Sequence, residues 1–304
     1  MPNHPTLLQQ FRSFYHQNKL DDLEVAIEYF SVFGGTSWNV NTTKPLVELI
    51  ATKILKNYTY IHTDITKLTY SNKLSHALLS ACATGDRRVY SSYKRARLSR
   101  EEGNEALHAL LRSELIELEY SLERPVREED DNSDKLGFIS PFMRFWFAFV
   151  SPYYKTIKEG DFSEVEKAFN NREQGFCDLI FEKLCQEFLK KSFTEDPIVE
   201  IGSYWDKNAE IDILAKTKSG KLIAGSTKYT HAKVKKTELA RLKEKCALAE
   251  LEPDIFVIFG KNGFSAELKA LKGDALKLFT LKSLKPLIEE IKENELIPCE
   301  GKKY

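Results

Sequence analysis

The sequence lacks the signatures of several common protein classes. Its five cysteines include no Cys-x-x-Cys pair, so neither a disulfide framework nor a zinc knuckle is indicated. It contains no His-Glu-x-x-His motif, which argues against zinc-protease chemistry, and no Gly-x-x-x-x-Gly-Lys-Ser/Thr phosphate loop. We therefore expect no ATP binding by that loop and no resident zinc.

An excess of charge and long apolar runs are also missing. Lys and Arg together number 45, as do Asp and Glu, so the formal net charge is zero and no overall basic field attracts nucleic acid or an anionic membrane. Any polyanion site must therefore be local. No run approaches the roughly 18 to 20 apolar residues of a membrane span, and residues 1–5 lack the basic-then-apolar layout of a signal peptide. We expect a cytoplasmic protein without a membrane partner.

The first 70 residues are predicted to be helical. Apolar residues recur at helical spacing over residues 7–15, and Asp21 is a candidate N-cap for a second helix. Gly34-Gly35 predicts the end of that helix, and Pro45 predicts the start of a third. This segment carries no chemical motif, so it is interpreted as a helical packing or self-association unit.

Residues 71–155 have the pattern of a winged helix followed by an aromatic helix. The predicted helices span residues 75–83, 87–98 and 99–111. The two predicted strands that follow span residues 114–120 and 136–139. In this layout the third helix usually enters the DNA major groove. The basic cluster of the segment comprises Arg87, Arg88, Lys94, Arg95, Arg97 and Arg100. The expected wing contains Glu128, Glu129, Asp130, Asp131 and Asp134, which repel phosphates. DNA contact and a structural or protein-docking role both remain open for this segment.

An aromatic run follows the expected hairpin. Residues 141–150 read Pro-Phe-Met-Arg-Phe-Trp-Phe-Ala-Phe-Val, and Pro152 predicts a stop soon after. Exposed aromatics can stack on bases, but this run has the length of a helix and little interleaved charge. We predict that it forms a core between domains.

Residues 156–304 are predicted to form an α/β domain with a mixed sheet. The predicted elements are a helix at 173–191, strands at 198–204, 210–217 and 221–229, a helix at 237–251, a strand at 254–260, a short helix near 266–271, a strand at 275–281 and a last helix to about 292. A run of strands flanked by helices favours helices on both faces of the sheet. The order is similar to the core of the PD-(D/E)xK nuclease fold, so the whole chain is expected to be an α+β multidomain protein.

Several separated motifs resemble one protein family. They are the Pro141-to-Pro152 run, Phe181-Glu182, Ile201-Gly-Ser-Tyr-Trp-Asp-Lys-Asn-Ala-Glu-Ile-Asp-Ile-Leu-Ala215 and Gly225-Ser-Thr-Lys228. Over roughly residues 71–290 the chain resembles the C-terminal region of archaeal and bacterial P-loop ATPases, where a winged helix precedes a nuclease-like domain of unknown function. About 70 helical residues stand where the ATPase domain would be, so ATPase activity is not carried over.

The resemblance also implies a metal site with one altered ligand. In the PD-(D/E)xK scheme Glu182 helps to orient the site, Asp212 and an acid two residues before Lys228 bind Mg²⁺, and Lys228 positions or activates water. Ser226 stands where that second acid is expected, and a neutral hydroxyl is a weak ligand for a hard dication. Strand alternation places Glu210 on the same face as Asp212, so Glu210 is a candidate for the missing charge.

Three functional hypotheses follow. The leading one is a protein that binds DNA or a protein partner without cutting and has no cofactor. The alternatives are a Mg²⁺- or Mn²⁺-dependent endonuclease that uses Glu182, Glu210, Asp212 and Lys228, and a homo-oligomeric interaction protein without nucleic acid. A local basic surface supports the first, and its members are Lys228, His231, Lys233, Lys235, Lys236, Arg241, Lys243 and Lys245.

Overall fold

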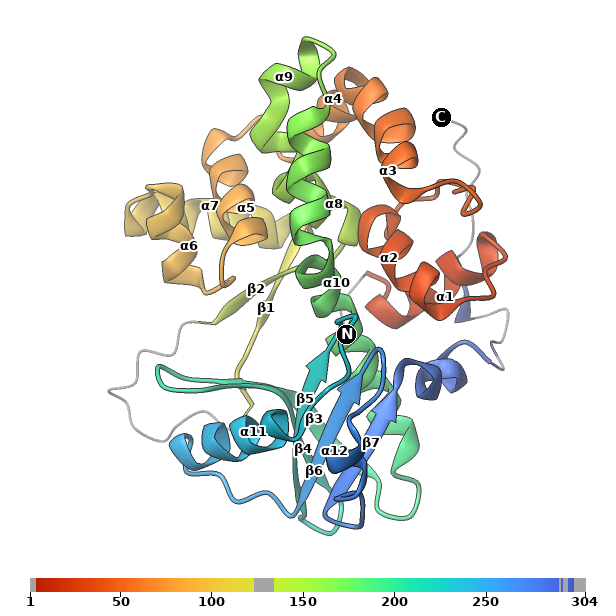
Figure 1. Ribbon diagram of the computed structural model, residues 1–304. Helices are drawn as coiled ribbons and strands as arrows, with labels where there is room; N and C mark the ends of the chain where they lie inside the picture. Colours follow the sequence, from red (N-terminus) through yellow and green to blue (C-terminus); the bar gives the residue numbers. More distant parts are fainter. Residues whose placement is uncertain (1–3, 123–133, 290, 292–294, 298–304) are drawn as a thin grey trace. The chain divides into compact units, whose positions relative to one another are not determined.

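The computed structural model describes residues 4–122, 134–289, 291 and 295–297 (Figure 1). The chain divides into two compact units. Unit 1 comprises Met1–Glu119, Ser133–Glu173 and Glu293–Tyr304, and unit 2 comprises Tyr120–Asn132 and Gln174–Lys292. The protein is of the mixed α+β class, with a helical N-terminal region and a five-stranded mixed sheet, which confirms the coarse fold expectation.

The N-terminal helices of unit 1 begin at well-defined caps. Helix α1 (Leu7–Gln17) opens with a capping box in which the Thr6 side chain accepts from Gln9 N. Helix α2 (Leu23–Phe33) is capped by Asp22, which accepts from the backbone N–H groups of the second and third helical residues. The expected cap Asp21 was therefore wrong by one position, because the carboxylate directly before the first helical residue is the one that reaches those groups.

The rest of the helical region follows Pro45, which directly precedes the next helix as expected. The elements are α3 (Leu46–Leu49), the π-helical turn η1 (Ile50–Ile54), the 3₁₀ turn η2 (Leu55–Asn57) and α4 (Tyr58–Leu68). None of the helices in the described part of the chain is both long and apolar enough to cross a membrane.

Three helices and a hairpin come next, in the order expected from the sequence. They are α5 (Lys73–Thr84), α6 (Val89–Ala96), α7 (Arg100–Arg112), β1 (Ile116–Glu119) and β2 (Lys135–Phe138). The two strands pair antiparallel, and the expected capping box of Ser99 and Glu102 opens α7. The acidic residues Glu128 to Asp131 of the expected wing lie outside the described residues.

The aromatic run is part of the core of unit 1. It forms α8 (Pro141–Phe145) and the π-helical turn η3 (Trp146–Val150), followed by η4 (Ser151–Tyr153) and α9 (Tyr154–Lys158). All of its side chains from Phe142 to Val150 except Arg144 are buried. Trp146 stacks on Tyr58 with ring centroids 5.5 Å apart. The predicted burial is confirmed, and the run belongs to unit 1. Its buried rings are not exposed to stack on a nucleobase.

Unit 2 is built on the five-stranded sheet. Its elements, with the helix α10 that begins in unit 1, are α10 (Ser163–Ser192), β3 (Ile198–Trp205), β4 (Glu210–Thr217), β5 (Leu222–Lys228), α11 (Lys236–Leu248), β6 (Ile255–Gly260), α12 (Ala266–Lys269), β7 (Leu276–Thr280) and the 3₁₀ helix η5 (Leu281–Leu287). The strand order is β3-β4-β5-β6-β7, antiparallel up to β5 and parallel from β5 to β7. Where an α-helix was expected after β7, the described part is 3₁₀ and contains Pro286, which lacks the N–H that a longer α-helix would use.

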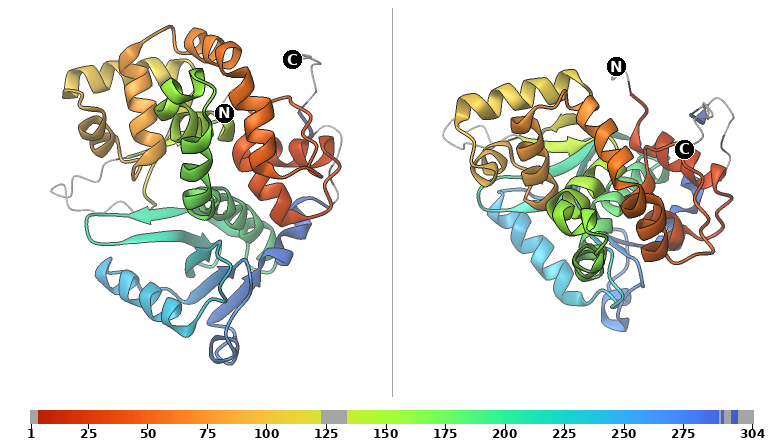
Figure 2. Two further views of the ribbon diagram at one scale, coloured as in Figure 1. Left: turned by 45° about the horizontal axis from the view of Figure 1, so that its top comes forward. Right: turned by 90° about the horizontal axis from the view of Figure 1, so that it is seen from above.

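Helices α10 and α11 cover opposite faces of the sheet, as adjacent residues of β6 show. Ile258 belongs to an apolar cluster with Leu239 of α11, whereas the Phe259 ring packs against Phe188 of α10 with centroids 6.0 Å apart. Because neighbouring strand residues point to opposite faces, each helix has its own side of the sheet, which the further views of Figure 2 allow the reader to follow. The two-sided cover explains why the strands are mostly apolar.

The described cysteines are buried, and burial changes the pKa of a thiol. Cys82, Cys177, Cys185 and Cys246 are free thiols in the interior, whereas Cys299 lies outside the described residues. Desolvation raises the pKa of Cys82 from 9.0 to about 12. Above pH 9 the unfolded thiol therefore loses its proton while the folded thiol keeps it, so stability falls as pH rises, by up to about 1.4 kcal/mol per pH unit.

We expect this slope to depend on Cys82 itself. In urea unfolding at pH 9 and pH 10, the wild type should lose about 1 kcal/mol more stability between the two pH values than Cys82→Ala, because alanine does not titrate. Other groups that ionise in this range act equally on both proteins. Equal losses in the two proteins would contradict the raised pKa.

Candidate functional site

Asp212 of β4 and Ser226 of β5 lie beside each other in the sheet. The register pairs Ile213 with Gly225, which places these two residues at the next pair along the strands. Ser226 Oγ lies 3.2 Å from Asp212 Oδ2, and the backbone N–H of Thr227 donates to the same oxygen at 2.8 Å. The Asp212 carboxylate is thus held in a fixed orientation by the end of β5.

A second carboxylate reaches the same serine from helix α11. Ser226 Oγ is 2.7 Å from Glu238 Oε1, and Ser226 is only 3% exposed. A serine hydroxyl has one proton to donate, so it satisfies one of these two carboxylates at a time. Asp212 and Glu238 therefore converge on one buried oxygen, and a cation near them would find two anionic side chains close together.

Lysine and arginine side chains offset this negative charge. Lys228, the last residue of β5, places Nζ 3.2 Å from Glu238 Oε1, and its side chain is 34% exposed. Arg241, one turn along α11, approaches the other Glu238 oxygen at 3.9 Å from a largely exposed position. Glu238 is thus a nearly buried anion with a partly accessible ammonium beside it.

Glu182 is connected to the same region through α10 and β3. Ser203 Oγ donates to Glu182 Oε1 at 2.8 Å. The buried Gln186 amide donates to Ser203 Oγ and to the backbone oxygen of Asp212, both at 3.0 Å. Burial raises the pKa of the Cys185 thiol well above its usual value, and the negative charges of Glu182 and Asp212 raise it further. Gln186 therefore ties the orientation of Glu182 to the β4 backbone.

Glu210 begins β4 at an exposed position opposite Trp205. Buried Ile211 and Ile213 alternate with it and with Asp212, in agreement with the predicted shared face. Over the described ranges, no group of three or more His, Cys, Asp or Glu side chains is arranged to hold a metal ion. The role of Glu182, Glu210 and Asp212 as a ligand set remains a prediction.

Sequence reasoning missed Glu238. The run from Tyr229 to Thr237 contains several lysines and no acid, which draws attention to a basic surface and away from Glu238. One signal was available: it is the first acidic residue after Lys228, and it falls in the first turn of the helix that follows β5. What the sequence could not show is that the loop between β5 and α11 returns this turn to Ser226.

A second missed residue is Lys261, which follows β6. It is buried, with Nζ 4.3 Å from the centre of the Tyr229 ring, and its backbone N–H donates to the Lys228 carbonyl. Strands β5 and β6 are parallel neighbours with Lys228 paired to Gly260, so Lys228 ends β5 and Lys261 directly follows the end of β6. Among the predicted basic residues, Lys233, Lys235 and Lys236 are exposed nearby in the chain.

The basic residues of unit 1 differ in their exposure and in their contacts. Arg87 forms a mostly buried ion pair with Glu119, with NH1 to Oε1 at 3.0 Å. Arg97 ends α6 in the left-handed conformation. Lys94, Arg95 and Arg97 have exposed side chains, whereas Arg88 is half-buried where its backbone bridges to Lys135. Arg87 thus has a structural contact, and the exposed members remain candidates for phosphate contact.

Comparison with known proteins gives a partial match. Residues 146–240 match the DUF234 family, described as archaeal and bacterial proteins of unknown function. The matched range includes every site residue from Glu182 to Glu238. An uncharacterised protein of Methanocaldococcus jannaschii is 34% identical over 109 residues, which are 33% of this chain and 24% of that protein. The chain thus aligns with about a quarter of that relative.

One solved structure also aligns along much of the chain. It is a protein of Vibrio cholerae with 11% sequence identity and a TM-score of 0.29, over 88% of this chain and 56% of the other. A TM-score this low does not indicate that the two proteins share a fold.

Proposed function

We propose that unit 2 is a PD-(D/E)xK-like domain that binds the phosphate backbone of DNA, and that α5 to β2 form a winged-helix-like module. The observation that carries the proposal is the contact of Asp212, Ser226, Glu238 and Lys228 at the end of β5. An acid and a lysine on adjacent strands of a mixed sheet, followed by a basic helix, are the parts that this fold uses to approach a phosphodiester. The order of α10, the three strands β3 to β5, α11 and β6 supports the same assignment.

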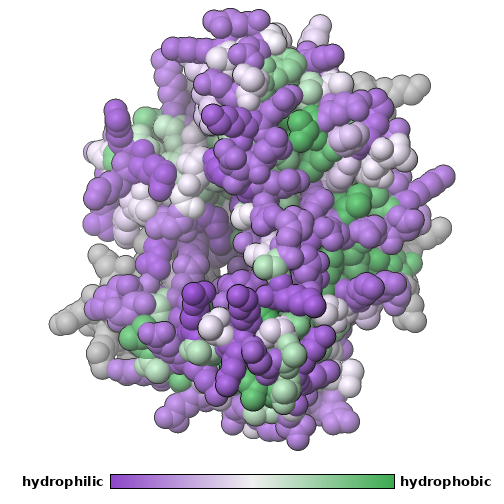
Figure 3. Space-filling view, viewed as in Figure 1, coloured by the Kyte–Doolittle hydropathy of each residue, from purple (hydrophilic) through white to green (hydrophobic). Residues whose placement is uncertain are grey.

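Binding to the backbone is expected to be independent of base sequence. Exposed lysines at the start of α11 present point charges, which suit phosphates but do not read base edges. Because the net charge of the chain is zero, attraction must come from local basic surfaces such as this one. Figure 3 shows hydrophilic side chains over most of one face of the protein.

The salt dependence of duplex binding tests this proposal. Replacing both Lys235 and Lys236 with alanine should weaken binding and lower the slope of log K against log salt by about 0.9 for each lysine that contacts a phosphate. The matched control is the double replacement of Lys269 and Lys272, which are exposed at and just after α12. Electrophoretic mobility shifts at several salt concentrations, in EDTA, measure both. Equal slopes in the two double variants, or no shift at low salt, would overturn this surface as the DNA site.

A second candidate function is metal-dependent DNA cleavage, and Glu238 is the observation that favours it. The donors fit Mg²⁺ or Mn²⁺, since both cations prefer carboxylate oxygens and Mg²⁺ is usually held by one or two carboxylates together with substrate phosphates. Asp212 and Glu238 would hold the cation in this chain. When bound, it would neutralise charge on the phosphoryl oxygens and activate water.

The residues around the two carboxylates have distinct tasks in that function. Ser226 donates one proton to either carboxylate and keeps the pair at a common point. Lys228 neutralises Glu238, and its partial exposure leaves the ammonium able to contact a phosphate. Gln186 and Ser203 fix Glu182 beside the strand that carries Asp212. The altered motif is thus complemented from α11, where the sequence-based alternative had used Glu210.

A further inference from the structure

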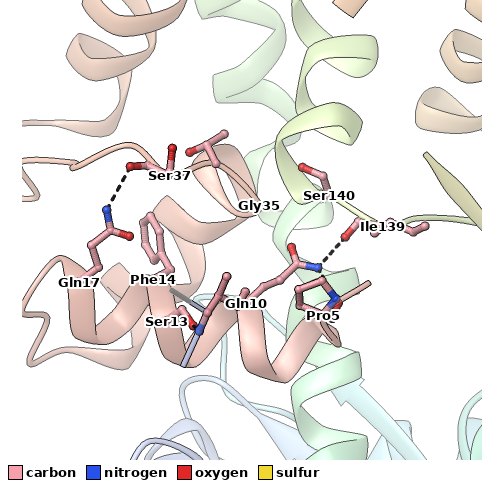
Figure 4. Close-up of a pocket in the computed structure, with 11 residues that line it drawn as sticks. Pro5, Gln10, Ser13, Phe14, Gln17, Gly35, Ser37, Ile139 and Ser140 are labelled. Carbon is pink, nitrogen blue, oxygen red and sulfur yellow. Dashed lines mark hydrogen bonds between the residues drawn. The ribbon is translucent and has the colours of Figure 1, made fainter. Parts of the chain in front are cut away.

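We propose that unit 1 contains a binding pocket for a small uncharged molecule that carries amide or amino N–H groups. The pocket has a volume of about 280 Å³ and lies between α1, the turn at Gly35–Ser37 and the backbone at Ile139–Ser140 (Figure 4). None of its lining residues has a charged side chain. Phe14 provides an apolar wall, so the pocket combines an apolar side with a few polar groups, as small-molecule sites do.

A buried oxygen in this pocket has no donor among the described parts of the chain. Gln10 is 7% exposed, and its amide nitrogen donates to the carbonyls of Pro5 and Ile139 at 3.1 and 3.0 Å. Both N–H groups are therefore used, and the orientation of the amide is fixed. Among the residues that the structure describes, Gln10 Oε1 has no hydrogen-bond partner, and leaving a buried acceptor unpaired costs stability. A ligand that donates to this oxygen would remove that cost.

Most other polar groups of the pocket also have only acceptor capacity left. Ser13, Thr36 and Ser140 each donate their hydroxyl proton to a backbone carbonyl. Both N–H groups of the Gln17 amide are used as well, by Ser37 O and Asn39 Oδ1. The wall is thus rich in acceptors and poor in donors.

This pattern selects the chemistry of the ligand. An anion such as a carboxylate or phosphate would meet lone pairs without donors, which is unfavourable. A cation would lose its hydration without gaining a counter-charge. A neutral amide or amino group supplies the missing donor at no such cost. The pocket wall is tight at Gly35, because a Cβ built there would lie 2.5 Å from Ser140 Oγ and 3.0 Å from Gln10 Oε1.

Three probes of similar size separate these cases. Benzamide carries the amide donor, acetophenone has a methyl group in its place, and benzoate is the anion. We expect benzamide to bind at least about tenfold more tightly than the other two, since only it pairs the buried Gln10 oxygen. Calorimetry gives the affinities, and NMR chemical-shift changes should map to α1 and the Gly35–Ser37 turn.

Two glycine variants provide a matched pair for the site. Gly35 has φ +79° and Gly160 has φ +83°, so alanine carries similar backbone strain at both, yet a Cβ at Gly160 meets nothing within 4 Å. Benzamide binding should be lost in Gly35→Ala and kept in Gly160→Ala. A Cβ at Gly35 would also lie 2.5 Å from Ser140 Oγ, so Gly35→Ala requires Ser140 to move, which Gly160→Ala does not match. Gln10→Met avoids that clash and is the deciding variant, in which tight binding should be lost.

The proposal is overturned if benzamide and acetophenone bind alike, or if no probe binds. Shift changes that map elsewhere, or retained binding in folded Gln10→Met, would have the same meaning. A benzamide-soaked crystal with only water at Gln10 Oε1 would also show that solvent is the natural partner of this oxygen.

Discussion

Replacing Glu238 with glutamine is expected to reduce Mn²⁺-dependent nicking of plasmid DNA by about a hundredfold or more, while duplex binding in EDTA stays the same or becomes slightly tighter. Glutamine keeps a hydrogen-bonding group within reach of Ser226, so the local structure should persist. It removes one of the two proposed anionic cation ligands, and even the loss of a group that only orients a metal ligand typically costs about 10- to 100-fold in metal affinity or activity. It also removes a negative charge beside Lys228 and Arg241, which favours phosphate binding.

Two other variants show which acid is responsible. Glu244→Gln changes an exposed glutamate on the same helix and should leave nicking unchanged. Glu210→Gln tests the acid that the sequence had suggested as the replacement ligand. Calorimetric titration with Mn²⁺ gives a readout independent of cleavage, in which Glu238→Gln and Asp212→Asn should each weaken binding and Glu244→Gln should not.

The outcomes separate the two candidate functions. Duplex binding without nicking by the wild type, in Mg²⁺ or Mn²⁺, would leave unit 2 as a binding domain and reject cleavage. Nicking that is lost in Glu210→Gln but kept in Glu238→Gln would reject the role of α11. Absence of both binding and nicking would reject the proposed function as a whole.

Trp146→Ala is expected to destabilise unit 1 by about 3 to 5 kcal/mol. Trp146 is 1% exposed, stacks on Tyr58 and contacts the Phe142 ring at 6.4 Å between centroids. The change deletes a large buried side chain and leaves a cavity that the surrounding π-helical turn cannot readily fill. Aromatic stacking contributes about 0.5 to 1.5 kcal/mol beyond burial. The predicted destabilisation of about 3 to 5 kcal/mol already includes this contribution.

Urea unfolding followed by far-UV circular dichroism measures this change. Tyr60→Ala is the matched control, because Tyr60 belongs to the same helix as Tyr58 but is 76% exposed. Its loss should change stability by no more than about 0.5 kcal/mol. A Trp146→Ala protein as stable as Tyr60→Ala would show that the aromatic run is not a core element.

Secondary structure was largely predictable from local sequence. Runs of β-branched and apolar residues predicted β4 and β5. The two strands are joined at Ser219-Gly220, where Gly220 has φ +89°. The exceptions have local causes. Asp21 and Asp22 are adjacent carboxylates, and only backbone geometry decides which one caps α2. Pro286 is tolerated inside the 3₁₀ helix η5, where an α-helix had been expected.

The site was only half predictable. The sequence placed Asp212, Ser226 and Lys228 on neighbouring strands, because strand period and a short turn fix which residues face each other. It gave no means to see that Glu238 contacts Ser226, since that contact depends on the path of a seven-residue loop and on how α11 packs across the sheet. The same holds for Lys261, which the parallel pairing of β5 and β6 brings beside Tyr229.

The amino-acid sequence by itself determined the periodic features of this protein: its helices, its strands, the buried aromatic run and the placement of Asp212, Ser226 and Lys228 on neighbouring strands. These follow from rules that act within a few residues. Only the tertiary structure decided that a carboxylate from α11 reaches Ser226, and that the Gln10 oxygen is buried without a donor from the described residues. Both depend on which distant segments meet, and that is set by packing of whole elements, to which local periodicity is blind.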